Sequence, residues 1–378
     1  MADTATTTTI PVFDGHNDTL LSLLDTGRDY YKRSDTGHID HVRAHEGGLV
    51  GGFFACFVPN PTGDHALTPE QQEALLGSGI RGVETVNEWG GPSLAYAQQF
   101  TNAMVATLLN LEAGGGAMLR DRTDDNPPST SPDPLNIVIF ADDLEENVEQ
   151  GRFSAILHFE GAEMIDENFY ALEMYHAAGL RSLGPVWSRS NQFAHGVPFQ
   201  FPASPDTGPG LTDAGRELVH ACNRLGIMLD VSHLNEKGFW DLAEITAAPI
   251  VATHSNAHAL CPSTRNLTDK QLDAIAESGG VVGLNYNVPF LHPDGARDAD
   301  MPLTVMADHV DYLVDKLGID GVALGSDFDG AMMPNDLSDA SKLQNLIAVL
   351  RERGYDDEAL RKIGYQNWVR VLRETWGM

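Results

Sequence analysis

Apolar segments of strand length alternate with helix-like segments along most of the chain. Eight such apolar segments lie at residues 11–18, 47–58, 153–163, 179–191, 226–234, 248–256, 279–287 and 321–330. Most are almost continuously apolar, as expected for parallel strands that are covered on both faces. The stretches 212–226 and 268–280 between them begin with Thr-Asp and end with Gly, which are helix start and stop signals. This alternation predicts an α/β fold, a (β/α)8 TIM barrel.

A doubly wound open sheet is the competing architecture, but no Gly-x-Gly-x-x-Gly motif follows an early strand. We expect one barrel over residues 10–378, preceded by a disordered tail at 1–9. The stretch 84–135 reads as an insertion between the second and third strands. Its part at 93–113 is predicted to be helical, and 120–134 is predicted to be a polar, proline-rich loop.

The charge balance excludes several classes of partner. The chain has 24 Lys and Arg against 54 Asp and Glu, a formal net charge of -30. Nucleic-acid binding requires a basic surface, and an acidic protein is repelled by anionic membranes, so neither partner is expected.

The sequence lacks the segments that direct a chain into or across a membrane. The N-terminus has neither the basic region nor the apolar region of a secretory signal peptide. No apolar run approaches the roughly 18 residues of a membrane span. Three scattered cysteines lack the spacing of a disulfide framework. We expect a cytoplasmic protein.

Polar residues follow the predicted strands at their C-terminal ends, where the active sites of such barrels are built. They are His16, Asp18, Glu160, His233, His254 and Asp327. A lone strand-end histidine or carboxylate is usually a structural hydrogen-bonding group or a helix cap, but their recurrence at one end of the barrel favours a shared site. Three imidazoles with two or three carboxylates exceed the ligands of one tetrahedral zinc. The set predicts two metal ions, bridged by Glu160 because a carboxylate has two oxygens to offer.

Other histidines and carboxylates fit this pattern less well. His158 shares the strand face of Glu160 and is expected to be a packed inward residue. Asp14 and Asp329 are candidates for orienting the ligands. His38, His41 and His45 are expected on a loop or helix surface, with an approach to the site left open for His45 only.

Several motifs together resemble the membrane (renal) dipeptidase family of binuclear zinc peptidases, in the form of its cytosolic bacterial members. They are "DGHND", "EGAE", "GLTDAGRELVHACNRLGIMLDVSHL", "APIVATHSNAHALCPSTRNLTD" and "GSDFDG", in the family order. The resemblance covers about residues 12–368 and is weakest in the insertion. It implies a barrel of the metal-dependent hydrolase type that cleaves dipeptides (L-Xaa-L-Xaa or L-Xaa-D-Xaa) with a zinc-bridging hydroxide. It also implies a homodimer.

The resemblance assigns roles residue by residue. His16, Asp18 and Glu160 match the ligands of one Zn²⁺ ion, and Glu160, His233 and His254 match those of the second. Arg265 matches the arginine that binds the terminal carboxylate of the substrate. Asp327 matches the acid/base that handles the attacking water and the leaving amine.

Trp187 departs from the family pattern, because animal members carry a histidine there that helps to polarise the scissile carbonyl. Tryptophan donates only one hydrogen bond and binds no metal, so either Arg189 or His195 replaces that histidine or Trp187 alters substrate binding. Two alternatives remain for the function. One is another binuclear amide or lactone hydrolase of the same barrel, although the usual bridging lysine is absent between Arg33 and Lys237. The other is a non-catalytic relative that binds zinc or a peptide.

Overall fold

The computed structural model describes residues 8–63, 66–76, 84–116 and 130–377. Within these residues each of the eight predicted segments contains a parallel strand. The strands are β1 (Val12–Asn17), β2 (Leu49–Phe57), β4 (Ser154–Glu160), β5 (Leu180–Gly184), β6 (Met228–Leu229), β7 (Val251–Ala252), β8 (Val281–Leu284) and β9 (Val322–Leu324). A two-residue strand, β3 (Asn136–Ile137), pairs with β4 outside this ring and was not predicted.

The strands close into a barrel, as predicted. One sheet runs β1-β2-β4-β5-β6 and a second runs β7-β8-β9. A parallel bridge between Asp230 and Val251 joins β6 to β7. A second bridge, between Asn17 and Phe328, joins β1 to the segment that follows β9. Because all strands are parallel, their C-terminal ends meet at one mouth.

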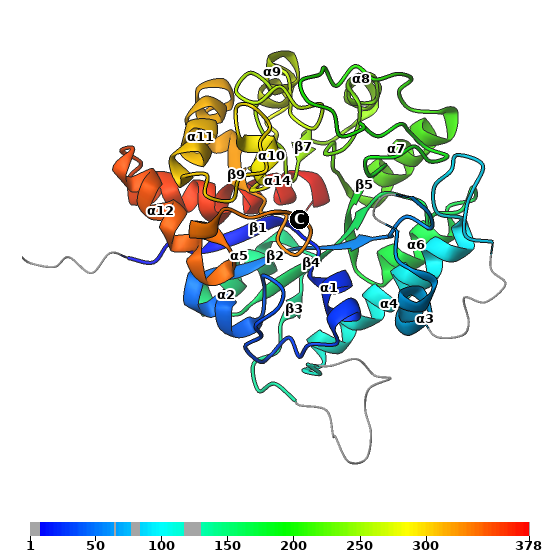
Figure 1. Ribbon diagram of the computed structural model, residues 1–378, viewed down its shortest axis with the longest axis horizontal. Coiled ribbons are helices and arrows are strands. Elements are labelled where there is room, and N and C mark those ends of the chain that lie inside the picture. Colours follow the sequence, from blue (N-terminus) through cyan, green and yellow to red (C-terminus); the bar gives the residue numbers. More distant parts are fainter. Residues whose placement is uncertain (1–7, 64–65, 77–83, 117–129, 378) are drawn as a thin grey trace, which may run out of the picture.

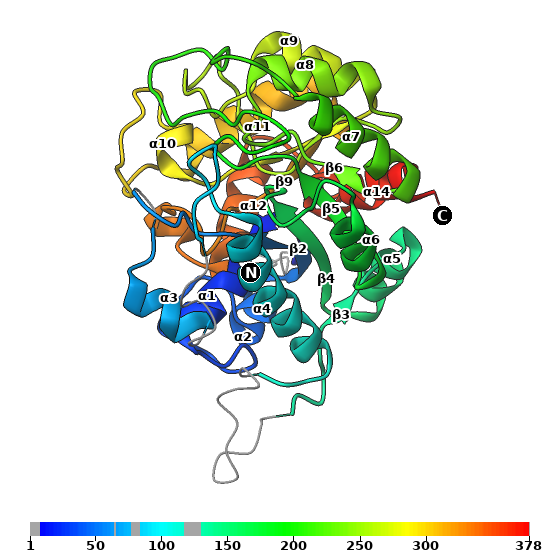
Figure 2. The same ribbon diagram turned by 90° about the vertical axis from the view of Figure 1, so that its right-hand side faces the viewer.

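Helices form an outer layer around these strands (Figures 1 and 2). In chain order they are α1 (Thr19–Thr26), α2 (His41–Gly47), α3 (Pro69–Leu76), α4 (Leu94–Glu112), α5 (Ala141–Gln150), α6 (Tyr170–Ala177), α7 (Asp213–Leu225), α8 (Glu236–Ile245), α9 (Asp269–Glu277), α10 (Val288–Leu291), α11 (Leu303–Leu317), α12 (Leu343–Glu352), α13 (Asp357–Arg361) and α14 (Asn367–Trp376). Short 3-10 helices lie at Ile319–Gly321, Asn335–Leu337 and Ala340–Lys342, and a π-helical turn at Lys362–Gln366.

Local sequence signals set the helix ends. The side chain of Thr212 accepts a hydrogen bond from Gly215 N at the start of α7, and Gly226 ends that helix with a φ of 66°. Thr268 begins α9 as part of a capping box with Gln271. Helix α4 lies within the expected insertion, at the position predicted to be helical. Most of the predicted tail and polar loop falls on residues 1–7 and 117–129, outside the described residues.

The barrel interior changes from apolar to polar along its axis. One cluster of buried apolar side chains joins Phe13, Phe53, Ile156, Met228, Val251, Val281 and Ala323, each from a different strand, with Trp368 of α14. Ile156, His158 and Glu160 alternate along β4 and therefore share one face. Both His158 and Glu160 are buried. The polar donors thus lie at the mouth end of the barrel, next to a buried apolar cluster.

Candidate metal centre

His16 and Asp18 lie together at the C-terminal end of β1. Nε2 of His16 lies 3.7 Å from Oδ2 of Asp18, and both residues are buried. Asp18 occupies the N-cap position of α1, but its side chain makes no capping hydrogen bond. Asp18 therefore faces His16 instead of serving as an ordinary helix cap.

Glu160, at the end of β4, lies between the three histidines. Its Oε1 lies 2.9 Å from Nε2 of His233 and 3.5 Å from Nε2 of His254. The same oxygen lies 3.6 Å from Nε2 of His16. Two groups of donor atoms, each within 4.8 Å of one another, share Glu160: one adds His16 and Asp18, the other His233 and His254. The structure therefore brings the five predicted ligands together from four strands.

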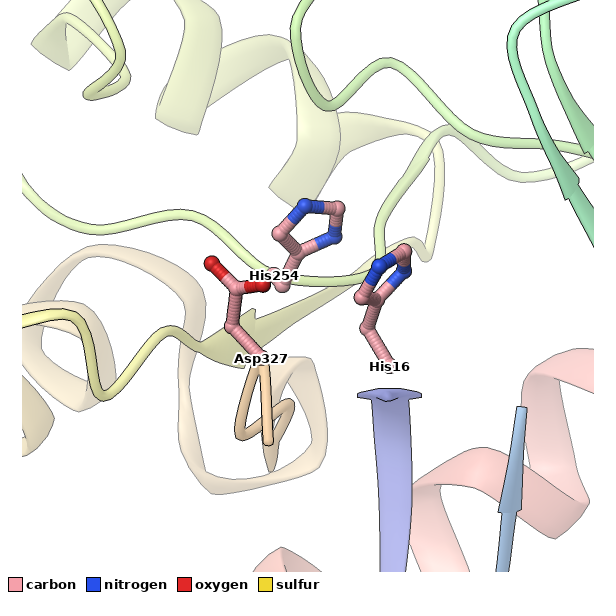
Figure 3. A group of neighbouring side chains, drawn as sticks. All are labelled: His16, His254 and Asp327. Carbon is pink, nitrogen blue, oxygen red and sulfur yellow. The ribbon is translucent and has the colours of Figure 1, made fainter. Parts of the chain in front are cut away.

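Asp327 joins this cluster from the loop after β9. One carboxylate oxygen of Asp327 and one ring nitrogen each of His16 and His254 all lie within 4.8 Å of one another. Figure 3 shows the three side chains side by side. Asp327 N donates a hydrogen bond to the carbonyl of His16, over 2.9 Å, and Oδ2 accepts one from Asn285 Nδ2, over 3.0 Å. Its φ of 64° lies in the left-handed region, a strain typical of functional sites.

The donor set fits a cationic group. Both ring nitrogens of His16 and Oδ1 of Asp18 are buried without a hydrogen-bond partner among the described residues, which ordinarily costs stability. Burial lowers the pKa of His16, but the carboxylates of Glu160, Asp18 and Asp327 together raise it to about 10. Burial raises the pKa of Glu160 well above its ordinary value. The site thus lacks positive charge, which divalent ions would supply.

A buried relay orients His254. The Thr253 hydroxyl donates to Oδ2 of Asp230 over 2.5 Å and lies 2.8 Å from Nδ1 of His254. Because its proton points to Asp230, the hydroxyl oxygen accepts from Nδ1–H of His254, which leaves Nε2 with its lone pair toward Glu160. Burial and the charges of His16 and Arg265 lower the pKa of His254 far below its ordinary value, so the ring stays neutral.

This relay was not predicted from the sequence. Asp230 is the one charged residue in the otherwise apolar stretch 227–231, and that isolated charge was the available signal. His233 has an analogous contact, since its Nδ1 lies 2.7 Å from Oγ of Ser188. His158 is an inward, buried residue as predicted, with Nδ1 2.8 Å from Oγ of Ser182.

Asp14 and Asp329 were candidates for orienting the metal ligands, but neither makes a hydrogen bond to a side chain of a predicted ligand. Asp14 accepts hydrogen bonds from N and Oγ of Ser326, over 2.6 and 2.9 Å. Asp329 pairs with Arg28 over 3.0 Å and accepts from His38 N over 2.6 Å. Both groups brace the loop after β9, which carries Asp327.

Arg265 is buried directly behind His254. Its Nη2 donates to the carbonyl of His254 over 3.0 Å and its Nη1 to Oγ of Ser255 over 2.9 Å. Its Nε has no hydrogen-bond partner among the described residues, so it retains a donor. Arg265 does not line the cavity at the barrel mouth.

Trp187 lines that cavity and packs on aromatic neighbours. Its ring centroid lies 5.0 Å from that of Phe57 and 5.4 Å from that of Phe199. The guanidinium of Arg189 lies 5.3 Å from the ring centroids of both Phe57 and Trp187. Arg189 also donates to Oε1 of Glu163 over 2.7 Å. Arg189 therefore supports the aromatic side chains from behind.

His195, the other suggested donor, pairs with Ser190 through Nδ1 over 2.9 Å and packs edge-on against Trp89. Neither Arg189 nor His195 lines the cavity. The cavity has a volume of about 790 Å³, and Asp18, Glu160, His233 and Asp327 lie at its base. Five aromatic side chains, hereafter the aromatic wall, form part of its lining: Phe57, Trp187, Phe199, Phe201 and Phe290.

Comparisons with known proteins agree with this geometry. The sequence pattern of the Membrane dipeptidase family (peptidase family M19) matches residues 3–377. A Klebsiella pneumoniae protein, named only as an uncharacterized protein in the pqqA 5′ region, is 51% identical over 242 residues, which are 64% of this chain and 89% of that protein. Among the described residues, no helix has the length and apolar character needed to cross a membrane.

Two solved structures are each 45% identical in sequence to this chain. Each match covers 98% of this chain and 100% of the solved chain. One is the dipeptidase AC, a metallopeptidase of family M19, with a TM-score of 0.84. The other is a metallopeptidase from Rhodobacter sphaeroides liganded with a phosphinate mimic of the dipeptide L-Ala-D-Ala, with a TM-score of 0.82.

Proposed function

Since the chain belongs to the membrane dipeptidase family, peptidase family M19, we propose that it cleaves dipeptides of the L-Xaa-L-Xaa or L-Xaa-D-Xaa type with two Zn²⁺ ions as cofactors. Membership makes it a metallopeptidase of the dipeptidase class. The observation that carries the finer proposal is the convergence of three imidazole nitrogens on Oε1 of Glu160, at 2.9 to 3.6 Å.

In this proposal Glu160 would contribute a ligand to each of the two ions. His16 and Asp18 would complete one set of ligands, and His233 and His254 would complete the other. When bound, the ions supply Lewis acidity toward the scissile carbonyl and lower the pKa of the attacking water. The relay from Asp230 through Thr253 holds the ring of His254 in the tautomer that can bind a metal.

Asp327 is the proposed acid/base. It takes a proton from the attacking water and returns it to the departing amine. Burial raises the pKa of its carboxyl group, although His16 and the hydrogen bond from Asn285 oppose that rise. A carboxylate at this position can accept the proton of the water and, once protonated, donate it to the amine.

Arg265 is the proposed partner of the free carboxylate of the substrate. A guanidinium offers a planar fork of donors that matches a carboxylate, and Nε of Arg265 is unpaired among the described residues. Because Arg265 lies behind the cavity lining, binding requires local movement of the residues in front of it. A carboxylate site beside the metals would select dipeptides over long peptide chains.

The aromatic wall is the proposed site for a substrate side chain. A cavity of about 790 Å³ is larger than two alanine residues need, so bulkier apolar side chains fit within it. The Rhodobacter sphaeroides relative, at 45% identity, binds a mimic of L-Ala-D-Ala, which supports acceptance of a D-residue at the C-terminal position.

The test combines metal analysis with a substrate panel. We expect two tightly bound Zn²⁺ ions per chain by elemental analysis after gel filtration in metal-free buffer, and release of free amino acids from L,L and L,D dipeptides. The corresponding dipeptide amides, which lack the carboxylate, serve as the control and should react more slowly. Two bound ions without cleavage of any dipeptide would instead support a zinc- or peptide-binding relative.

A further inference from the structure

Helix α2 presents two histidines on one face. His41 and His45 are four residues apart, one helical turn, and so are neighbours on the helix surface. Their Nε2 atoms lie 3.2 Å apart. A carboxylate from a distant part of the chain joins them: Oδ2 of Asp133 lies 3.8 Å from Nε2 of His41 and 3.9 Å from Nε2 of His45.

These three distances match the geometry of a metal site. The point equidistant from three atoms with these separations lies about 2.1 Å from each, which is the usual Zn–N and Zn–O distance in proteins. One ion at that point would contact all three donor atoms at their present separations. Two imidazoles and one carboxylate form a ligand set that first-row divalent ions favour.

The surroundings favour a bound cation. Neutral imidazoles have a lone pair to offer, but two Nε2 atoms that face each other can share only one proton. One ion would satisfy both nitrogens and the carboxylate at the same time. The rings of His41 and Tyr31 form a T-shaped pair with centroids 5.4 Å apart, which restricts the orientation of His41.

We propose that His41, His45 and Asp133 bind a third divalent transition-metal ion, outside the catalytic centre. None of the three lines the cavity at the barrel mouth, and α2 lies at the outer edge of the molecule in both views (Figures 1 and 2). The side chains of His45 and Asp133 are about half exposed, at 49% and 54%, so water completes the coordination and the ion exchanges with solvent. The ion links α2 to the described segment that begins at Thr130. Its binding stabilises the folded chain by mass action.

The test compares the intact enzyme with His45→Gln and Asp133→Asn, loaded with metal under the same conditions. The probe is Zn²⁺ alone, and the readouts are isothermal titration and the melting temperature with added Zn²⁺. We expect the parent enzyme to bind one more ion per chain than either variant, and to gain thermal stability from Zn²⁺ that both variants lack. Dipeptide hydrolysis should be the same in all three proteins.

His220→Gln is the matched control, because His220 is an exposed helix residue with Arg216 and Arg224 one turn away in place of a second histidine. This control should retain the extra ion. The measured quantity is the difference in bound zinc between the parent and each variant. The number of ions in the catalytic centre therefore does not affect the result. Equal zinc stoichiometry in the parent and the His45→Gln variant would overturn the proposal and leave an ordinary histidine pair on a helix surface.

Discussion

Nδ2 of Asn285 donates a hydrogen bond to Oδ2 of Asp327 over 3.0 Å, and so connects the end of β8 to the loop after β9. The contact holds one oxygen of a carboxylate whose backbone is in the left-handed region. Oδ1 is then the oxygen that we expect to exchange protons with the attacking water and the leaving amine.

Replacement of Asp327 by Asn should remove proton transfer but keep the shape of the side chain. We expect kcat on a dipeptide to fall by roughly 10²- to 10⁴-fold, the usual contribution of a general acid/base. Zinc content, measured by elemental analysis, should stay at the parent value. Loss of one zinc with the activity would show instead that Asp327 is a ligand, and full activity would refute the assigned role.

Thr253→Val should disturb the orientation of His254, because valine keeps the shape but has no hydroxyl to connect His254 with Asp230. We expect zinc affinity to fall roughly 10- to 100-fold, as for other groups that orient a metal ligand. Competition with a chelator measures this without any substrate. Thr253→Ser keeps the hydroxyl and should restore the affinity; if both variants bind zinc like the parent, the relay has no orienting role.

Arg265→Met should weaken the recognition of a free carboxylate. We expect kcat/KM on dipeptides to fall about 100-fold, because a charge-assisted pair of hydrogen bonds is lost. Hydrolysis of the matching dipeptide amides should change much less, since they carry no charge at that end. An equal loss on both substrates would mean that Arg265 acts only through its contacts with His254 and Ser255.

Because His309 is buried, its protonation should make the stability of the folded protein depend on pH. Burial lowers the pKa of His309 to about 4, although the hydrogen bond from its Nε2 to the carbonyl of Leu291 opposes this effect. Between about pH 6.5 and pH 4 the unfolded chain binds a proton at His309 that the folded protein does not. Stability is therefore lost as the pH falls through this window, by about 2 kcal/mol at pH 5.

Urea unfolding of the parent and of His309→Gln at pH 7 and pH 5 measures this dependence. The variant should be the less stable protein at pH 7, because Nδ1 of His309 accepts a hydrogen bond from Ala257 N. The difference between the two proteins should shrink by about 2 kcal/mol at pH 5. A difference that is the same at both pH values would show that His309 takes up no proton on unfolding.

The barrel and the composition of its mouth could be predicted from the sequence for one physical reason. Strand-length apolar segments that alternate with capped helices have few ways to bury both faces, and parallel strands in a closed ring bring their C-terminal ends to one place. His16, Glu160 and His254 were therefore expected to meet, although the first and the last lie 238 positions apart in the chain. The alternation did not identify β3, which lies outside the ring of eight strands and pairs only with β4.

Only the tertiary structure decided which polar neighbours serve the site. Arg189 and His195 were equal candidates by proximity to Trp187, yet the folded chain pairs one with Glu163 and the other with Ser190. The spacing of His41 and His45 is visible in the sequence, but the arrival of Asp133 beside them depends on how the chain returns after α4. Strand and helix periods are local properties that neighbouring residues encode. Contacts between loops depend on the packing of the whole barrel, and no short stretch of sequence encodes them.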